Sequence, residues 1–215
     1  MEQRKFWSRI RIAFDGCEGW VSNHQITFIE EKEFQKVEKC KSTKYTTDLV
    51  SFVETDNSVL LPILLGSHIV DTAELPYKFD GNYSDANQDK NNLVNTALLY
   101  LNAPYLWGGK TPFGVDCSGF TQMVYKINGY RLLRNASEQA VQGVALSFIE
   151  ESELGDLAFF DNADGVIDHV GLIMENNYII HAYGKVRIDR LDHTGIFNTE
   201  SGKYTHQLRV IKKII

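Results

Sequence analysis

The first 80 residues contain short runs of β-forming side chains separated by turn residues. Residues 7–13 alternate apolar and polar positions, which is typical of a strand with one buried face. Residues 49–54 and 59–65 are rich in apolar side chains, and Asp, Asn and Ser occupy positions 56–58 between them. This arrangement predicts a β-hairpin, so we expect residues 1–80 to form a small β module.

From about residue 86 the pattern changes to helical spacing and later returns to strands. Apolar or small residues recur at helical intervals in 87–102 and in 117–127, and a glycine-rich loop separates the two segments. The remaining apolar segments are short and rich in β-forming residues, at 157–160, 170–174, 178–182, 186–188 and 208–211. Helices followed by an antiparallel meander indicate an α+β fold rather than a βαβ alternation.

Composition excludes several functional classes. The chain has 215 residues, with 22 Lys and Arg against 28 Asp and Glu, and a formal net charge of −6. An acidic chain without a Lys/Arg-rich run is poorly suited to binding nucleic acid. Three cysteines are too few for a disulfide scaffold at this length. The longest strongly apolar stretch, 59–65, is far shorter than a membrane span.

The start of the sequence bears on location. Residues 1–14 lack the continuous apolar core of a secretory signal. We therefore expect a cytoplasmic protein, taken to be a monomer, in a reducing compartment where a cysteine is either inert or chemically useful. A native chain that starts further upstream is the alternative, because it would have carried any signal in the missing part.

Cys117 is the cysteine with a chemically useful setting. It lies within Gly-Val-Asp-Cys-Ser-Gly-Phe at 114–120, where the second helical segment starts. Free backbone N–H groups and the positive end of the helix dipole then favour a thiolate. The alternative is a small residue that packs at a helix start. Cys17 and Cys40 lack such neighbours, and we interpret both as incidental thiols.

His169 and His181 lie in the predicted meander and are candidates for the base that a cysteine nucleophile needs. A three-residue loop between their strands places His181 opposite Gly171 and both histidines on one face, whereas a two-residue loop puts them on opposite faces. In the first case Cys117 attacks a carbonyl, and its backbone N–H serves as an oxyanion donor. His169 accepts the thiol proton and returns it to the leaving amine, while His181 holds the His169 ring in the useful tautomer.

Two other interpretations fit these residues less well. Each histidine alone could satisfy a local hydrogen bond. Zinc ligation by Cys117, His169 and His181 is disfavoured because their spacing is long and unlike that of a compact zinc site. We therefore expect no metal and no cofactor.

Several segments, in order, resemble the NlpC/P60 family of cysteine peptidases, which has a papain-like fold. They are YLWGGK at 105–110, GVDCSGF at 114–120, RNASEQ at 134–139, GDLAFF at 155–160 and DHVG at 168–171. His181 fits the family's third catalytic position. The resemblance covers about residues 86–215 and implies a papain-like α+β catalytic domain there.

The resemblance also implies a substrate. Members with N-terminal SH3-like modules cleave between γ-linked D-glutamate and an L-diamino acid (diaminopimelate or lysine) in bacterial cell-wall peptides. In the subgroup that takes released muropeptides with a free N-terminal L-alanine, the positions of Tyr105, Asp116 and Ser118 recognise the alanine amine. Asp116 as a helix cap and Tyr105 as a packing aromatic are the alternatives. For the protein as a whole, the alternatives are an endopeptidase of the intact wall and an inactive module that binds wall peptides.

The N-terminal region resembles a bacterial SH3 module, chiefly in GCEGWV at 16–21. Residues 7–21 resemble the middle or end of such a module. We therefore expect 1–80 to be an SH3-like region without its upstream strands, which would expose a strand edge. The resemblance implies that this module forms one wall of the cleft, with Glu74 as a candidate lining residue. The expected domains are thus 1–80 and 86–215.

Overall fold

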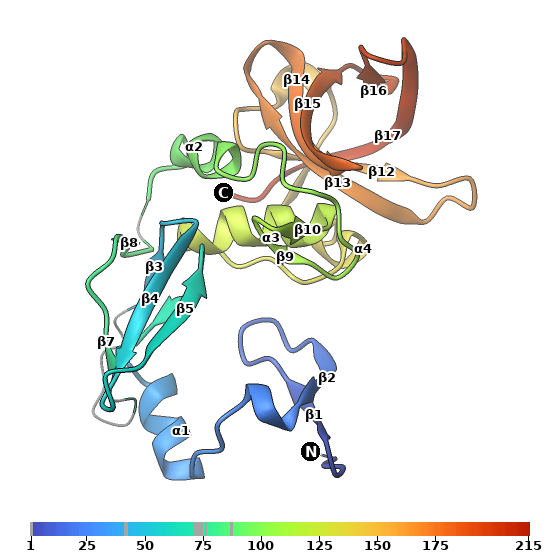
Figure 1. Ribbon diagram of the computed structural model, residues 1–215. Coiled ribbons are helices and arrows are strands. Elements are labelled where there is room, and N and C mark those ends of the chain that lie inside the picture. The colour runs from blue at the N-terminus through green and yellow to red at the C-terminus, as the bar shows by residue number, and fades with distance from the viewer. Residues whose placement is uncertain (1, 41–42, 71–74, 76, 87) are drawn as a thin grey trace.

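The computed structural model describes residues 2–40, 43–70, 75, 77–86 and 88–215, and Glu74 lies outside these residues. The second half of the chain has its helices first and an antiparallel sheet after them (Figure 1). This order confirms the α+β architecture expected from the sequence.

The strands of residues 144–213 form one antiparallel sheet, in the order β11-β17-β12-β13-β14-β15-β16. Because β17 also pairs with β16, the sheet closes on itself. The strands are β11 (Val144–Leu146), β12 (Leu157–Asp161), β13 (Ile167–Met174), β14 (Tyr178–Tyr183), β15 (Lys185–Leu191), β16 (Gly195–Asn198) and β17 (Lys203–Lys213). The predicted segments 157–160, 170–174, 178–182 and 186–188 lie in β12 to β15, and 208–211 lies in the longer β17, whereas β11 and β16 were not predicted.

Helix α3 (Cys117–Ile127) packs against this sheet and matches its predicted bounds. Its apolar side chains join those of β12 to β14 and of α2 (Asn92–Leu98) in one core. The two-residue strands β9 (Lys110–Thr111) and β10 (Gly114–Val115) precede α3, and the short α4 (Ala136–Gln139) follows it.

Helix α2 is shorter than the predicted 87–102. After Leu98 the backbone bonds tighten to an i−3 pattern, and Asn102 takes a left-handed φ of 67° that ends the helical path.

Among the described residues before 86, the strands form three separate sheets. In them β1 (Trp7–Arg11) pairs with β2 (Glu18–Ser22), β3 (Lys44–Thr46) lies between β6 (His68–Ile69) and β8 (Tyr83–Ser84), and β4 (Val50–Thr55) lies between β5 (Leu60–Leu64) and β7 (Tyr77–Lys78). The β4–β5 pair confirms the predicted hairpin. The SH3-like assignment of this region and the two domain ranges stay predictions.

Helix α1 (Glu31–Glu38) was not predicted. None of its side chains is buried, and its apolar residues are only Phe34 and Val37, one turn apart, which is a weak signal in a segment of this length. A capping box starts it, in which the Glu33 side chain accepts a hydrogen bond from the Glu30 backbone N–H at 2.8 Å.

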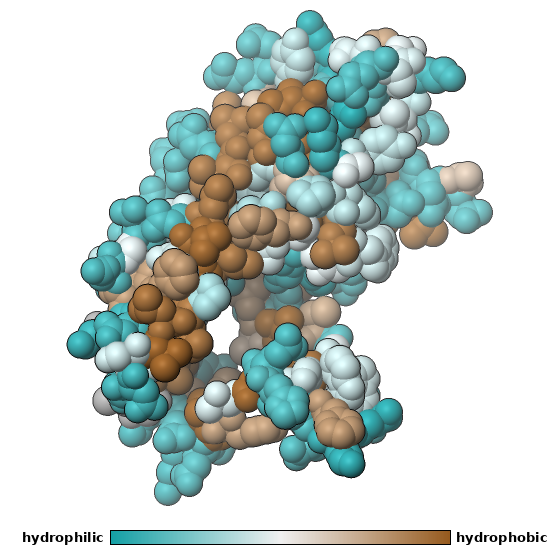
Figure 2. Space-filling model, viewed as in Figure 1, coloured by the Kyte–Doolittle hydropathy of each residue, from teal (hydrophilic) through white to brown (hydrophobic). Residues whose placement is uncertain are grey.

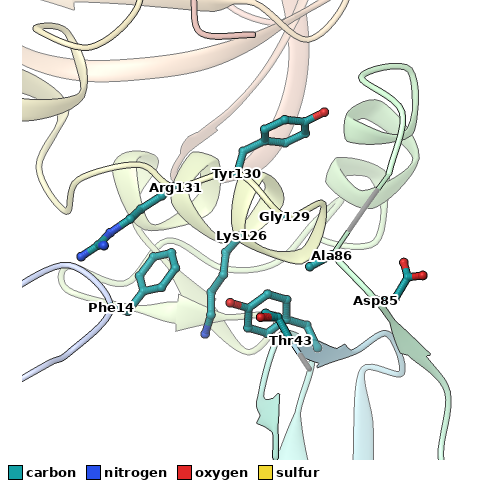
Figure 3. Close-up of a pocket in the computed structure, with 9 residues that line it drawn as sticks. Phe14, Thr43, Asp85, Ala86, Lys126, Gly129, Tyr130 and Arg131 are labelled. Atoms are coloured by element: carbon teal, nitrogen blue, oxygen red, sulfur yellow. The ribbon is translucent and has the colours of Figure 1, made fainter. Parts of the chain in front are cut away.

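The loop between β1 and β2 contacts the second half of the chain. The Asp15 carboxylate accepts a hydrogen bond from Gln122 Nε2 at 3.0 Å and lies 3.7 Å from Lys110 Nζ. Lys126 Nζ lies 5.2 Å from the centroid of the Phe14 ring. A cavity of about 370 Å³ lies at this junction (Figure 3), lined by Phe14, Thr43, Tyr45, Asp85, Ala86, Lys126, Gly129, Tyr130 and Arg131. Polar and cation–π contacts therefore hold the N-terminal loop against α3.

Exposed apolar side chains gather over the β4–β5 hairpin and the neighbourhood of α2 (Figure 2), among them Phe52, Leu60, Leu61, Leu98 and Leu101. These elements are short. No helix within the described residues has the length and apolar character needed to cross a membrane.

Candidate active site

Asp116 defines the start of α3. Its backbone is extended, and its Oδ1 accepts a hydrogen bond from the Gly119 N–H at 2.6 Å, so it is the N-cap. A Cβ on Gly119 would lie 2.4 Å from the carbonyl oxygen of Gly109, so the helix start and the glycine loop are in close contact. Cys117 is thereby fixed in the first turn of α3, as the sequence predicted.

The Cys117 thiol rests against the backbone of β13 on both sides of His169. Its Sγ lies 3.6 Å from the carbonyl oxygen of Asp168, and the Val170 N–H points at the sulfur. The side chain is only 5% exposed. The structure therefore brings Cys117 and His169 together from segments 52 residues apart (169 − 117).

The β13–β14 hairpin has the three-residue loop that places both histidines on one face. Residues Glu175–Asn177 form the connection, and Gly171 pairs with His181. A Cβ on Gly171 would lie 2.9 Å from the Cβ of His181 and 2.7 Å from Cδ1 of Ile179. Glycine at this position thus makes room for the His181 side chain.

A chain of buried polar groups runs from His169 through the sheet. His169 Nε2 lies 2.8 Å from His181 Nδ1, and His181 Nε2 lies 3.1 Å from Asp189 Oδ2. Arg187 holds both oxygens of that carboxylate, with Nε 2.6 Å from Oδ2 and an NH2 group 3.1 Å from Oδ1. Burial alone would raise the pKa of Asp189, but the hydrogen bonds from His181 and Arg187 outweigh it and lower this pKa below its ordinary value.

An ionised Asp189 fixes the direction of each hydrogen bond in this chain. A carboxylate only accepts, so His181 Nε2 carries a proton and His181 Nδ1 is the acceptor for His169 Nε2–H. A neutral His169 protonated at Nε2 has its lone pair at Nδ1. This is the protonation state that a base for Cys117 needs.

Both members of the Cys117–His169 pair are neutral in the free protein. Burial raises the pKa of Cys117 to about 11, and the Asp116 carboxylate adds to the rise. Burial also lowers the pKa of His169 well below its ordinary value, with His181 adding to the shift. The expectation that the helix start favours a thiolate is therefore wrong for the free protein. The backbone N–H groups do lower the pKa, but desolvation of the thiolate is the larger effect.

Asp116 and Ser118 belong to a second polar cluster, which Arg134 completes. The Arg134 guanidinium donates to both oxygens of Asp116, at 2.6 and 3.0 Å, and to Ser118 Oγ at 3.0 Å. The Gly108 N–H donates to the same carboxylate at 2.8 Å. The structure thus brings Asp116 and Ser118 together, and it already engages their oxygens with partners inside the protein.

Tyr105 lies in the loop before β9 and is 36% exposed. Its backbone N–H donates to the carbonyl of Gly184 at 3.0 Å, which anchors the loop beside the end of β14. Burial raises the pKa of Tyr105, and a thiolate at Cys117, when it forms, and the Asp116 carboxylate raise it further. The phenol is therefore close enough to both groups to feel their charge.

Comparison with known proteins assigns the family. Residues 102–204 match the family model described as NlpC/P60 family. A gamma-D-glutamyl-L-lysine dipeptidyl-peptidase from Bacillus cereus is 30% identical over 190 residues, which are 78% of this chain and 57% of that protein. The chain belongs to the NlpC/P60 family. The dipeptidyl-peptidase 6 of Lysinibacillus sphaericus is 37% identical over 108 residues, 48% of this chain and 37% of that protein.

The chain spans little more than half the length of the Bacillus cereus relative and less of the Lysinibacillus one. A crystal structure of an NlpC/P60 family protein from Bacillus cereus aligns with all of this chain and 78% of that one. The TM-score is 0.78 at 23% sequence identity, so the likeness concerns the fold. The NlpC/P60 domain here thus has the papain-like α+β fold that the sequence indicated.

Three members of this NlpC/P60 site were not predicted from the sequence: Asp189, Arg134 and His206. Asp189 could have been found by strand parity, because His181 pairs with Arg187 and a residue two positions further lies on the same face. Arg134 opens the RNASEQ segment, which resembles the family, but nothing in that segment indicates that its guanidinium reaches Asp116, 18 positions earlier. His206 stacks on His169, with ring centroids 4.0 Å apart, but it comes from β17, and no local spacing links it to β13.

Proposed function

We propose that this protein is a cysteine peptidase that hydrolyses peptide bonds in bacterial cell-wall peptides. The observation that carries the proposal is that the Cys117 thiol lies against the backbone on both sides of His169, and that His169 is linked through His181 to Asp189 by buried hydrogen bonds, each with one permitted direction. Relatives named gamma-D-glutamyl-L-lysine dipeptidyl-peptidase and probable endopeptidase p60 support this reaction class.

The proposed reaction moves one proton back and forth. As Cys117 Sγ attacks the carbonyl carbon, its proton passes to His169 Nδ1 and the carbonyl electrons move onto oxygen, which the Cys117 N–H stabilises. The C–N bond then breaks, the leaving amine takes the proton from His169, and a thioester remains on Cys117. Water, activated by His169, hydrolyses the thioester and restores the thiol.

His181 and Asp189 act on this reaction through His169. When His169 gains its second proton it becomes an imidazolium, and the His181 lone pair accepts from it at 2.8 Å. The negative charge of Asp189 acts on His169 through His181 and offsets part of the energetic cost of a buried imidazolium. Since Cys117 and His169 start neutral, the attack creates both charges together, and a buried carboxylate nearby lowers the energy of the cationic partner.

We propose as substrate the γ-D-glutamyl-L-diamino-acid bond of released muropeptides with a free N-terminal L-alanine. The family resemblance and the names of the relatives support this choice. The alanine ammonium would be recognised by Tyr105, Asp116 and Ser118. Because Arg134 already pairs with Asp116, the ammonium would share this carboxylate with the guanidinium. Tyr105 is the most exposed of the three residues, so an entering peptide would reach it first. Cytoplasmic recycling suits a nucleophile that a reducing compartment keeps as a free thiol.

Product analysis by mass spectrometry tests the proposal. L-Ala-γ-D-Glu-L-Lys and its diaminopimelate counterpart should yield L-Ala-D-Glu plus the diamino acid. Cys117→Ala should abolish the reaction, and the matched control Cys40→Ala, which alters a thiol outside the site, should retain it. Hydrolysis that survives Cys117→Ala would refute the mechanism.

The same assay separates the rival functions. N-acetylated peptides should be cleaved at least tenfold more slowly if the free amine is recognised. Equal rates on free and acetylated peptides, or faster release of peptides from purified intact wall, would favour a wall endopeptidase. Peptide binding without any product would favour an inactive binding module.

A further inference from the structure

Three histidines converge from three strands of the sheet. His169 on β13, His181 on β14 and His206 on β17 each offer one ring nitrogen, and these nitrogens lie within 4.8 Å of one another. The His206 ring stacks on His169 at an interplanar angle of 21° and stands edge-on to His181, with centroids 5.8 Å apart. His206 is partly exposed, whereas the other two are buried, so His206 is the member of the cluster that solvent contacts most.

Hydrogen bonds on the far side of two of these rings direct their lone pairs inward. His181 gives its Nε2 proton to Asp189, which leaves Nδ1 unprotonated. His206 Nδ1 lies 2.9 Å from Thr205 Oγ1, and donation in that direction leaves Nε2 unprotonated. A carboxylate behind a histidine is the arrangement that orients imidazole ligands of zinc and raises their basicity.

The rings are also in the neutral form that ligation requires. Burial lowers the pKa of all three, that of His206 to about 4, and the nearby histidines add to the shifts of His169 and His206. Arg187, whose guanidinium pairs with Asp189, also lowers the pKa of His181, whereas Asp189 raises it. Near neutral pH the cluster is thus three neutral imidazoles beside one carboxylate.

We propose that His169 Nε2, His181 Nδ1 and His206 Nε2 form a binding site for Zn²⁺, and that zinc bound there reversibly inhibits the peptidase. Tetrahedral zinc with nitrogen ligands at about 2.0–2.1 Å requires ligand atoms roughly 3.3 Å apart, so the nitrogens need only small side-chain shifts. Three imidazoles leave the fourth position for water. This set of three ligands differs from the disfavoured set Cys117, His169 and His181, because His206 takes the place of Cys117.

Inhibition follows from the tautomer of His169 and rests on the proposed function. In the active arrangement His169 carries its proton on Nε2 and uses Nδ1 as the base. Zinc on Nε2 needs the lone pair there, so the proton moves to Nδ1, and no proton is released. A His169 protonated at Nδ1 cannot accept the Cys117 proton, so bound zinc and an active base exclude one another.

Calorimetric titration of zinc into the full-length Cys117→Ala protein tests the site without using activity. We expect one zinc per chain, and Co²⁺ in the same protein should give the visible d–d absorption of a tetrahedral site without thiolate-to-cobalt charge transfer. His206→Gln and His206→Phe in this background should each weaken zinc binding at least tenfold. The Phe variant keeps a flat ring over His169 but has no nitrogen. The control His193→Gln, which changes an exposed histidine, should bind as the parent does.

The outcomes separate this proposal from the proposed function. Failure of Cys117→Ala to bind zinc, or unchanged binding in either folded His206 variant, overturns the zinc site, even if the peptidase is active. If the native thiol enzyme is active, zinc should inhibit it, EDTA should reverse the inhibition, and His206→Gln should need at least tenfold more zinc. Equal zinc sensitivity of His206→Gln and the native enzyme would overturn the inhibitory role. Inactivity toward all wall peptides would refute the proposed function and leave the calorimetric result standing.

Discussion

Asp189 Oδ2 accepts a hydrogen bond from His181 Nε2 at 3.1 Å, in a place where neither side chain is more than 1% exposed. Arg187 is held to the same carboxylate and keeps it ionised. A buried acceptor that cannot become a donor sets the proton positions of His181 and then of His169. Asp189 thus sets the direction of proton transfer at Cys117, although two histidines, His169 and His181, lie between them.

Asp189→Asn should lower kcat/KM on a cell-wall peptide by about 10- to 100-fold. An amide can present its NH2 to His181 Nε2, which moves the His181 proton to Nδ1 and reverses the hydrogen bond with His169. The loss should be smaller than the roughly 10⁴-fold effect of changing an aspartate that contacts the base directly, because one more ring intervenes. Glu200→Gln, which removes only the exposed outer partner of Arg187, is the control and should stay within about twofold. Equal activity of both variants would contradict the relay.

Gly171→Ala should destabilise the fold by about 1–3 kcal/mol, because the added methyl group would overpack the β13–β14 hairpin against His181 and Ile179. Urea unfolding with an unchanged m-value measures the difference. Gly19→Ala is the matched control, since a Cβ there meets no atom within 4 Å. If Gly171→Ala unfolds at the same urea concentration as the native chain, the hairpin tolerates the methyl group and the close approach is not required.

The sequence predicts the parts of the site that depend on local signals, such as a helix cap or the alternation of side chains along a strand. The start of α3 at Cys117 and the shared face of His169 and His181 follow from a cap residue and from strand parity over a three-residue loop. Both are properties of short, contiguous segments. For the same reason the positions and order of β12 to β15 are predictable, while their full lengths, the strands β11 and β16 and the closure of the sheet by β17 are not.

The parts that sequence did not predict depend on contacts between distant segments or on desolvation. The stacking of His206 on His169 requires β17 to return beside β12 and β16. The ionisation of Cys117 was misjudged for a different reason. A helix start is a local feature, but the burial that raises the pKa of the thiol is created by the whole fold around it.

Arg134→Ala should destabilise the protein by about 3 kcal/mol, because it leaves the buried Asp116 carboxylate without its cation. Arg134→Lys should recover part of this loss, since lysine keeps the positive charge but cannot make the bidentate contact with the carboxylate. The exposed Arg209, 3.7 Å from Asp161, supplies the control, and Arg209→Ala should change stability by less than about 0.5 kcal/mol. A double-mutant cycle with Asp116→Asn isolates the pair. A coupling energy near zero would show that Arg134 acts elsewhere.

Chemical modification distinguishes a neutral thiol from an ion pair at Cys117. Because burial raises the pKa of this thiol to about 11, the rate of its alkylation by iodoacetamide should stay low at pH 7 and rise only well above pH 9. Peptide mapping by mass spectrometry follows Cys117 separately, with the less buried Cys17 as a label for reagent activity. Fast alkylation of Cys117 that is flat from pH 6 upwards would show a preformed thiolate–imidazolium pair and contradict the neutral resting state.

Stability should fall as the pH drops below about 6.5, and His206 should contribute to the slope. Its pKa lies near 4 in the folded protein, mainly through burial, and near 6.5 in the unfolded chain. Between these values the unfolded state binds more protons, so the stability due to neutral His206 is present above pH 6.5 and is lost as the pH falls toward 4. The pKa values of His169 and His181 shift in the same direction.

His206→Gln should therefore lose less unfolding free energy than the native chain between pH 7 and pH 4.5, as measured by urea denaturation at each pH. Parallel profiles for the two proteins would mean that His206 is protonated equally in the folded and unfolded states, and the burial of its ring on His169 would then have no effect on its charge.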